Sequence, residues 1–285
     1  MPRFSLTAAI AEGVTHGSIV GAFTCYNLEQ LAGVVRAAES TTQSVCLLLA
    51  EGAFRSALGP ALCRAMVSAA EQATVPIAIQ LDHTRDLELM RRALDQGVTA
   101  VMADGSTLPY PDNVRLVTDA RAIAIRYGAS VEAELTHIPG DEDRAVAVAT
   151  TTGTDVSRAV EFVDQTGADL LAVAIGNVHG AYATPPLLDL TRLSRLRAAL
   201  HLPLTLHGTS GVPDDQVRSA IVNGIQKINV NTELRRSYLD AAHETTRDEL
   251  SSANLLAIGA RLSAAVEATT AVHLDRCRHR QAQHD

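Results

Sequence analysis

Short apolar runs rich in β-branched residues recur along the chain, and amphipathic segments separate them. Eight such runs stand out, at residues 18–26, 43–50, 75–82, 98–104, 128–135, 169–176, 202–208 and 225–231. Segments between them, such as LEQLAGVVRAA and DDQVRSAIVNG, repeat apolar residues at the spacing of a helix that packs on one face. This alternation indicates parallel strands covered by helices.

The number and order of the runs favour a barrel. Eight β/α units lie between residues 18 and 231, which fits a (β/α)8 TIM barrel better than an open doubly wound sheet, the alternative that the pattern leaves open. A further apolar segment predicts an extra C-terminal helix over roughly residues 251–280. No Gly/Ser-rich linker divides the chain, so we predict a single α/β barrel domain over residues 1–285.

Composition narrows the classes of function. The 285-residue chain carries a formal net charge of −8, which argues against nucleic acid as a partner because phosphate backbones favour basic surfaces. No apolar run approaches the roughly 20 residues that span a bilayer, and we recognise no export signal, so we expect a cytoplasmic protein without a membrane partner. Four cysteines without paired spacing predict neither a disulfide framework nor a cysteine-bound metal.

Polar residues gather where the predicted strands end, which is where barrel enzymes place their active sites. These residues are Asp82, His83, Asp104, Glu132, Glu134, His179 and His207. His83, His179 and His207 follow three different strands, and three imidazoles with one open position suit a catalytic Zn²⁺. Each histidine alone could be structural, but the three together favour a metal site. We expect the other histidines to be solvated, namely His16, His137, His201, His243, His273, His279 and His284.

Two segments of small residues predict a phosphate site. HGTSG (207–211) and NVNTEL (229–234) follow the last two predicted strands, where barrels often bind phosphate. Small residues let backbone N–H groups approach an anion, and Thr232 would begin a helix whose N-terminus favours negative charge. A plain turn uses the same residues and is the alternative. The long loop over 136–155, which carries Glu142, is either functional or a solvated acidic turn.

The sequence resembles the class II fructose/tagatose-bisphosphate aldolases, nearest to the tagatose-bisphosphate branch. The resemblance rests on QLDHT, VMADGS, VEAEL, TGADLLAVAIGNVHGAY, LPLTLHGTSGVP and KINVNTEL, which stand in family order over essentially the whole chain. It implies a lyase, a zinc-dependent aldolase that reversibly cleaves a ketose (bis)phosphate to dihydroxyacetone phosphate and an aldehyde. It also implies a homodimer or homotetramer.

The resemblance assigns roles to individual residues. Those that match the zinc ligands are His83, His179 and His207, and those that match supporting or alternative carboxylate ligands are Asp104 and Glu134. Asp82 matches the acid/base that serves the hydroxyl of the aldehyde half, and Glu142 matches a loop glutamate that moves the carbon proton. The residues that match the binding site for dihydroxyacetone phosphate are Gly180, Gly208, Thr209, Ser210, Asn229, Val230, Asn231 and Thr232. Carbonyls around these segments match a site for a monovalent cation, Na⁺ or K⁺.

Lys227, the only lysine of the chain, raises the alternative of a Schiff-base aldolase. Strand parity points it into the barrel with Asn229, so its position does not exclude that role. The complete set of three histidines favours the metal route. We therefore interpret Lys227 as a structural or electrostatic group beneath the phosphate site.

Departures from the family pattern concern the aldehyde half. Thr24 stands where the family has Asn, Ala50 stands where it has Ser or Thr, and Glu51 follows. Pro139 alters a loop stretch that is rich in glycine in the family and would stiffen it. A lost amide, a lost hydroxyl and a gained carboxylate should weaken binding of a second phosphate, so one alternative is a non-phosphorylated aldehyde partner. Further alternatives are a metal-dependent hydrolase and a non-catalytic, sugar-phosphate-binding accessory subunit.

Overall fold

The computed structural model describes residues 4–140, 147–148, 153–182 and 186–278. Eight parallel strands form a closed barrel in the order β1-β10-β9-β7-β5-β4-β3-β2. They are β1 (Val20–Thr24), β2 (Val45–Ala50), β3 (Ile77–Thr84), β4 (Ala100–Ala103), β5 (Ser130–Glu134), β7 (Leu170–Ala172), β9 (Leu204–Leu206) and β10 (Ile225–Val230). Each predicted apolar run overlaps one of them, so the barrel prediction is confirmed and the open sheet is wrong.

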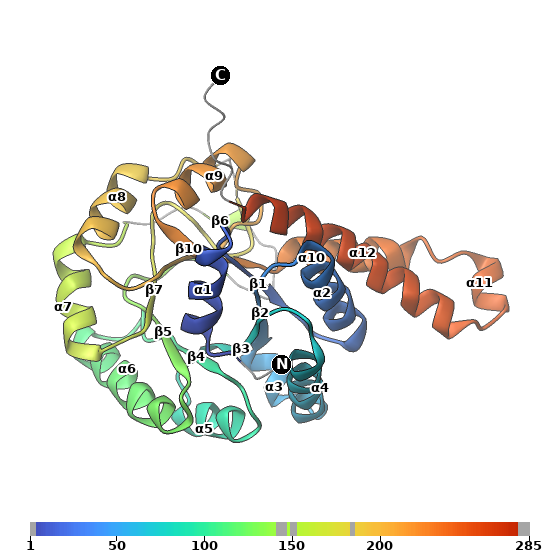
Figure 1. Cartoon of the computed structure of the whole chain (residues 1–285), viewed down its shortest axis with the longest axis horizontal. Coiled ribbons are helices and arrows are strands. Elements are labelled where there is room, and N and C mark those ends of the chain that lie inside the picture. Colours follow the sequence, from blue (N-terminus) through green and yellow to red (C-terminus); the bar gives the residue numbers. More distant parts are fainter. Residues whose placement is uncertain (1–3, 141–146, 149–152, 183–185, 279–285) are drawn as a thin grey trace.

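Helices between the strands cover the outside of the barrel (Figure 1). They are α2 (Leu28–Thr41), α3 (Glu51–Arg55), α4 (Gly59–Gln72), α5 (Leu87–Asp95), α6 (Tyr110–Ala124) with the 3-10 turn η1 (Ile125–Tyr127), α7 (Val156–Thr166), α8 (Leu190–Ala199), α9 (Asp214–Val222) and α10 (Thr232–His243). Asn27, Asp86, Asp155 and Asp189 precede four of these helices and accept hydrogen bonds from backbone N–H groups of the first turn. Such caps fix where each helix begins.

An N-terminal helix that we did not predict, α1 (Leu6–Thr15), contacts β1, β2, β3 and β10 at the amino end of the barrel. Its Leu6, Ala9 and Ile10 are buried in one apolar cluster with inward-facing strand residues such as Val20 and Leu48. The interior of the barrel is therefore apolar at this end, and the polar groups are left to the opposite mouth.

The C-terminal segment forms α11 (Arg247–Ser251) and α12 (Leu255–Arg276), and α12 confirms the predicted extra helix with narrower bounds. α12 packs against α2 and α10, and Figure 1 shows α11 and the start of α12 projecting from the barrel. Within the described part of the chain, α12 is the one helix long and apolar enough to cross a membrane, by length and composition only. Its packing against α2 and α10 is that of a helix in the outer layer of the barrel.

A small two-stranded sheet outside the barrel was also not predicted. It pairs β6 (Ala147–Val148), from the long loop after β5, with β8 (Ala181–Tyr182), just beyond His179. The same loop forms a bridge between Gly140 and His179. The loop after β5 is therefore held against the segment that carries one of the three histidines.

Candidate metal centre at the barrel mouth

Strand alternation turns a set of polar side chains into the barrel at its carboxyl end. These side chains are Gln80 and Asp82 of β3, Glu132 and Glu134 of β5, His207 after β9, and Lys227 and Asn229 of β10, and all are at most 5% exposed. Such deeply buried polar groups require partners, because an uncompensated buried charge is costly. Glu132, His207, Lys227 and Asn229 find such partners in one another.

His83 breaks this alternation. It follows Asp82, so a regular strand would turn it away from the barrel axis. The β3–β4 register shifts between Leu81 and Thr84, and His83 has a φ of 42°, in the left-handed region that a non-glycine residue seldom occupies. This irregularity brings Asp82 and His83 to the same mouth. Backbone strain of about 1–3 kcal/mol at such a residue is typical of functional sites.

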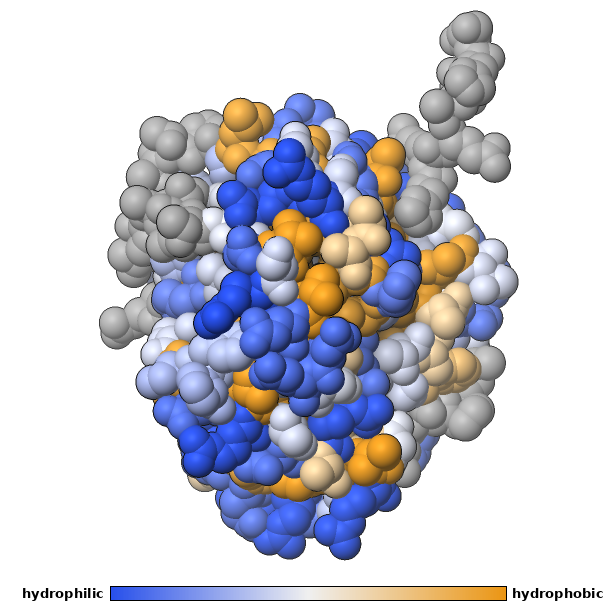
Figure 2. Space-filling view, turned by 90° about the vertical axis from the view of Figure 1, so that its left-hand side faces the viewer, coloured by the Kyte–Doolittle hydropathy of each residue, from blue (hydrophilic) through white to orange (hydrophobic). Residues whose placement is uncertain are grey.

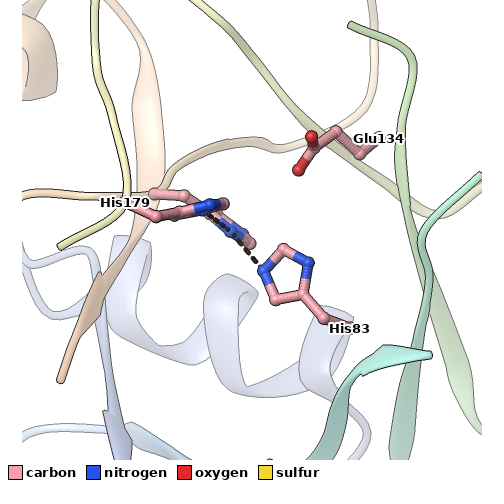
Figure 3. Close-up of side chains that lie close together, drawn as sticks. His83, Glu134 and His179 are labelled. Atoms are coloured by element: carbon pink, nitrogen blue, oxygen red, sulfur yellow. Dashed lines mark hydrogen bonds between the residues drawn. The ribbon is translucent and has the colours of Figure 1, made fainter. Parts of the chain in front are cut away.

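The three predicted histidines converge on one point. His83 Nε2 lies 3.0 Å from His207 Nδ1, and His179 Nε2 lies 3.4 Å from the same atom. With Glu134 they form a cluster whose ligand atoms all lie within 4.8 Å of one another. A tetrahedral ion with bonds of about 2.0–2.1 Å separates its ligand atoms by roughly 3.3 Å, so these spacings fit Zn²⁺. Figure 3 shows the imidazoles and the Glu134 carboxylate directed toward one another.

Two carboxylates orient these imidazoles. His83 Nδ1 lies 3.0 Å from Asp104 Oδ2, and His207 Nε2 lies 2.7 Å from Glu132 Oε1. Each of these ring nitrogens therefore donates its proton outward, which leaves lone pairs on His83 Nε2 and His207 Nδ1. Two lone pairs that face each other at 3.0 Å repel unless a cation lies between them. Burial keeps His207 neutral, because it lowers the pKa of this imidazole to about 4 despite the hydrogen bond with Glu132.

Glu134 is the fourth member of the cluster. Its Oε1 accepts the backbone N–H of Ile138 at 2.9 Å, whereas its Oε2 is buried without a hydrogen-bond partner in the described part of the chain. Burial, reinforced by the negative charge of Asp104, raises the pKa of Glu134 to about 7. A buried carboxylate oxygen that has no hydrogen-bond partner among the described residues and lies beside three imidazoles is suited to bind a metal ion.

A buried ion pair lies beneath the histidines. Lys227 Nζ donates to Glu132 Oε2 at 2.8 Å and to Asn229 Oδ1 at 2.7 Å, and all three residues are at most 4% exposed. Burial disfavours both charges, but Lys227 holds the pKa of Glu132 below its usual range and Glu132 raises the pKa of Lys227. Both groups are therefore charged, and Lys227 is not the neutral amine that a Schiff base requires.

The residues predicted to hold phosphate lie on neighbouring loops. Gly180 and Gly208 have positive φ angles of 89° and 62°, and a Cβ at Gly208 would lie 1.9 Å from the Val178 carbonyl oxygen. Thr209 Oγ1 donates to the carbonyl of Asn229 at 2.7 Å, and Ser210 Oγ donates to a Glu233 carboxylate oxygen. These contacts join the loop after β9 to the end of β10.

The end of β10 leads directly into a helix. α10 begins at Thr232, as predicted, and its N-cap Asn231 makes no side-chain cap hydrogen bond. The Asn231 amide instead donates to the Tyr26 hydroxyl at 3.0 Å. Val230 completes β10 as a buried residue, paired with Phe23 of β1. The first N–H groups of α10 thus face the same mouth without a side-chain cap.

Other predicted residues have mixed outcomes. Asp82 is 5% exposed and pairs in register with Ala50 of β2, next to His83. Glu142 lies outside the described residues. The prediction that His273 is solvated is wrong, because α12 buries it to 3% exposure against α10 and its charged Glu233. The four cysteines are buried and none forms a disulfide, which agrees with the sequence analysis.

Sequence reasoning missed two residues that position this site. The Tyr182 hydroxyl donates to the Gly208 carbonyl at 2.7 Å and accepts the Val178 N–H at 3.1 Å, so it ties two loops together. The Pro139 carbonyl accepts the His179 N–H at 2.7 Å, which fixes the backbone of that histidine. No spacing rule predicts either contact, because each joins loops that only the closed barrel brings together.

The fold and the site define a class of protein, a (β/α)8 barrel with three histidines and a glutamate at its mouth that could together hold a metal ion. The family model described as fructose-bisphosphate aldolase class-II matches residues 5–282, and the chain belongs to this family. It is therefore an aldolase, a lyase of a family that binds sugar phosphates and is generally metal-dependent.

Individual relatives agree with this assignment. The chain is 37% identical over 247 residues to the fructose-bisphosphate aldolase of Geobacillus stearothermophilus, covering 86% of each. It is 38% identical over 222 residues to the protein YdjI of Escherichia coli K12, covering 78% of this chain and 80% of YdjI. The crystal structure of the E. coli YdjI aldolase superposes with a TM-score of 0.84 at 31% identity, covering 97% of each chain. Membership of the tagatose-bisphosphate branch stays a prediction.

Proposed function

We propose that this chain is a zinc-dependent aldolase that joins or releases dihydroxyacetone phosphate and an aldehyde. The observation that carries the proposal is the convergence of His83 Nε2, His179 Nε2 and His207 Nδ1 at separations of 3.0 and 3.4 Å. The outward protons of His83 and His207 are held by carboxylates. Three imidazoles and an optional carboxylate are ligands that Zn²⁺ prefers, and they leave a position for substrate. Bound there, the ion would supply a Lewis acid that polarises the ketone of the donor.

The phosphate of the donor would bind across the loops of β7, β9 and β10. Gly180 and Gly208 bring backbone without side chains to this edge of the mouth, and the uncapped N-terminus of α10 favours an anion. Thr209, Ser210, Asn229, Val230, Asn231 and Thr232 complete the segments that would hold it. Carbonyls of Val178, Gly180, Gly208 and Ser210 would also suit Na⁺ or K⁺.

Proton transfer would use two carboxylates. Asp82 stands at the end of β3 beside His83, from where it would exchange a proton with the hydroxyl of the aldehyde half. Glu142 would move the proton on the carbon that forms the new bond. Pro139 and Gly140, which precede Glu142 in the same loop, contact the backbone of His179, so this part of the loop lies beside the proposed metal centre.

Two alternatives have weaker support. A metal-dependent hydrolase would need the histidine cluster but not the phosphate loops, and family membership favours the aldolase. A non-catalytic accessory subunit has no reason to keep His83 in a strained backbone conformation aimed at the other imidazoles.

We also propose that the protein is a cytoplasmic homodimer or homotetramer that assembles through α11 and α12. Leu250, Leu255 and Leu256 on this projecting segment are 64%, 77% and 88% exposed. Figure 2 shows that the opposite flank of the molecule carries mainly hydrophilic residues, with apolar residues in smaller groups. An apolar surface of this kind typically marks an interface. Light scattering on the purified protein tests it, and a monomer at micromolar concentration would disprove it.

Exchange of the carbon proton of dihydroxyacetone phosphate with deuterated water tests the function without knowledge of the aldehyde. We expect exchange that EDTA abolishes, that Zn²⁺ restores, and that is lost in His179→Ala. The matched control is His201→Ala, which removes an exposed histidine far from the mouth and should leave exchange unchanged. Absence of exchange in folded, zinc-loaded wild-type protein would disprove the proposed donor.

A further inference from the structure

A cavity of about 460 Å³ opens beside the metal centre. The residues that line it are His83, Thr84 and Asp104, together with the charged residues Glu51, Arg55, Arg85 and Asp86. In the barrel order, β3 and β4 lie across from β9 and β10, so this cavity faces the phosphate loops from the other side of the histidines. Its volume is ordinary for a small-molecule site, where roughly 300–1,000 Å³ is usual.

This position is where the aldehyde half must lie if the proposed function is right. The donor phosphate would occupy the β9–β10 side, and its reacting carbon would lie at the metal. A second substrate would then approach that carbon from the side of β2, β3 and β4, where this cavity lies. Asp82, the residue that would serve the aldehyde oxygen, ends β3 on this same side.

The guanidinium of Arg55, which lines the cavity, forms ion pairs with two carboxylates. Its Nε lies 2.6 Å from Glu51 Oε1 and its terminal nitrogen 2.8 Å from Asp86 Oδ2. Asp86 is itself fixed, because its other oxygen accepts the backbone N–H groups of Glu88 and Leu89 at the start of α5. The hydrogen bond from Arg55 lowers the pKa of Asp86, so the carboxylate stays ionised. A phosphate that binds Arg55 would lie beside both carboxylates and be repelled by them.

The guanidinium of Arg85, which also lines the cavity, has hydrogen-bond partners of its own. Arg85 Nε donates to the backbone carbonyl of Asp104 at 2.9 Å, and its terminal nitrogen donates to the Thr107 hydroxyl. Two guanidinium groups thus stand against three carboxylates, those of Glu51, Asp86 and Asp104. Ala50, at the end of β2, adds no side-chain donor. The described lining of the cavity therefore carries no net positive charge, which disfavours a phosphate dianion.

We propose that this cavity binds the aldehyde half as an uncharged polyhydroxy chain, and that Glu51 is the residue that excludes a terminal phosphate. The inference rests on the proposed function and specifies its second substrate. The Glu51 carboxylate would accept hydrogen bonds from sugar hydroxyls while it keeps Arg55 occupied. Replacing it with a neutral amide leaves the guanidinium paired with Asp86 alone and removes one source of repulsion of an anion.

Aldol addition of dihydroxyacetone phosphate to paired aldehydes tests the proposal. The pairs are glyceraldehyde with glyceraldehyde 3-phosphate, and erythrose with erythrose 4-phosphate. For wild-type protein we expect kcat/KM to favour the uncharged member of at least one pair by about 10-fold or more. For Glu51→Gln we expect that ratio to move toward the phosphorylated member by about 10- to 100-fold, the usual effect of one hydrogen bond to a charged group.

The matched control is Glu267→Gln. Glu267 pairs with Arg36 Nε at 2.7 Å and with similar exposure, but on α12 and α2, away from the mouth, so the ratio should not change. A wild-type preference for the phosphorylated member of both pairs overturns the proposal. So does a Glu51→Gln variant, shown by its melting temperature to be folded, with an unchanged ratio. Proton exchange of the donor alone separates the two failures, because it persists when only the aldehyde assignment is wrong.

Discussion

Glu132 lies between His207, a proposed metal ligand, and Lys227, the only lysine of the chain. One of its oxygens holds the proton of His207 and the other pairs with Lys227, and none of the three side chains is exposed. The same carboxylate thus sets the tautomer of a metal ligand and neutralises the only lysine. We therefore expect Glu132 to affect stability through Lys227 and metal affinity through His207.

Glu132→Gln should lower both quantities. It leaves Lys227 buried without its counter-charge, which costs about 3–5 kcal/mol of unfolding free energy, and it loosens His207, which lowers zinc affinity by about 10- to 100-fold. The double variant Glu132→Gln/Lys227→Met should recover most of the stability but not the zinc affinity. Urea unfolding and competition with a chelator measure the two quantities. Joint recovery of both in the double variant would contradict this division of roles.

The buried His273 makes the protein sensitive to acid. Burial is the main cause that lowers its pKa to about 4, although Glu233 and Asp214 oppose that shift and Arg276 adds to it. The unfolded chain, with an ordinary pKa near 6.5, therefore binds a proton that the folded chain does not. Stability is full above about pH 6.5 and falls as the pH approaches 4.

His273→Gln should reduce this acid loss by about 3 kcal/mol between pH 7 and pH 4. Urea unfolding at both pH values, with EDTA present so that metal release does not contribute, measures the difference. The control His201→Gln changes an exposed histidine and should keep the wild-type pH dependence. Equal losses in His273→Gln and wild-type protein would show that the buried imidazole is not the cause.

At the scale of elements, backbone conformation places the site as much as side chains do. The irregular end of β3 turns His83 inward, and the loop after β9 turns sharply at Gly208 directly after His207. Gly208 lies against the Val178 carbonyl of the preceding loop. The Tyr182 hydroxyl donates a hydrogen bond to the Gly208 carbonyl. Two loops that carry ligands are therefore packed backbone to backbone.

Gly208→Ala should separate these loops. Its Cβ would meet Val178 O at 1.9 Å, so the loop must move and carry His207 away from His179. We expect reduced zinc content and lost proton exchange, together with a lower melting temperature. Gly167→Ala is the control, because Gly167 has a similar φ of 64° but nothing within 4 Å of the added Cβ. It should cost only about 1–2 kcal/mol for the left-handed conformation and leave zinc content unchanged.

For the whole molecule, the projecting α11–α12 segment is the feature that a lone barrel does not explain. By length and composition only, α12 is long and apolar enough to span a membrane. In its apolar 18-residue stretch, 22% of the residues are buried within the chain. Its outer part presents apolar side chains to the surroundings at the far end from the packed barrel. A second copy of the chain would bury this surface.

The double variant Leu255→Glu/Leu256→Glu should shift the protein toward monomer. The two leucines are 77% and 88% exposed, so the fold of one chain should tolerate glutamate there, whereas an apolar interface should not. Light scattering and melting temperature measure the change. Leu187→Glu is the control, because Leu187 is 80% exposed on the loop before α8 and lies outside the segment. An unchanged oligomer in the double variant would place the interface elsewhere.

The sequence by itself determined the barrel and its eight strands, and it predicted the histidines and the glutamate that the structure brings together at the mouth. Buried parallel strands need continuous apolar runs, and ligands at a barrel mouth must follow those runs, so both leave a local pattern. Strand parity also places Glu132, Glu134, Lys227 and Asn229 inside the barrel. Each of these features depends on residues that are close together in the sequence, so the sequence alone can predict it.

Only the tertiary structure decided which partner each buried group takes. The Glu132–Lys227 pair joins residues 95 positions apart, and the pairs of Tyr182 with Gly208 and of Pro139 with His179 join separate loops. The burial of His273, the sealing of the barrel by α1 and the neutralisation of Arg55 by Glu51 and Asp86 arise in the same way. Hydrogen bonds and ion pairs act over a few ångströms of space, and chain order sets such distances only after the barrel has closed.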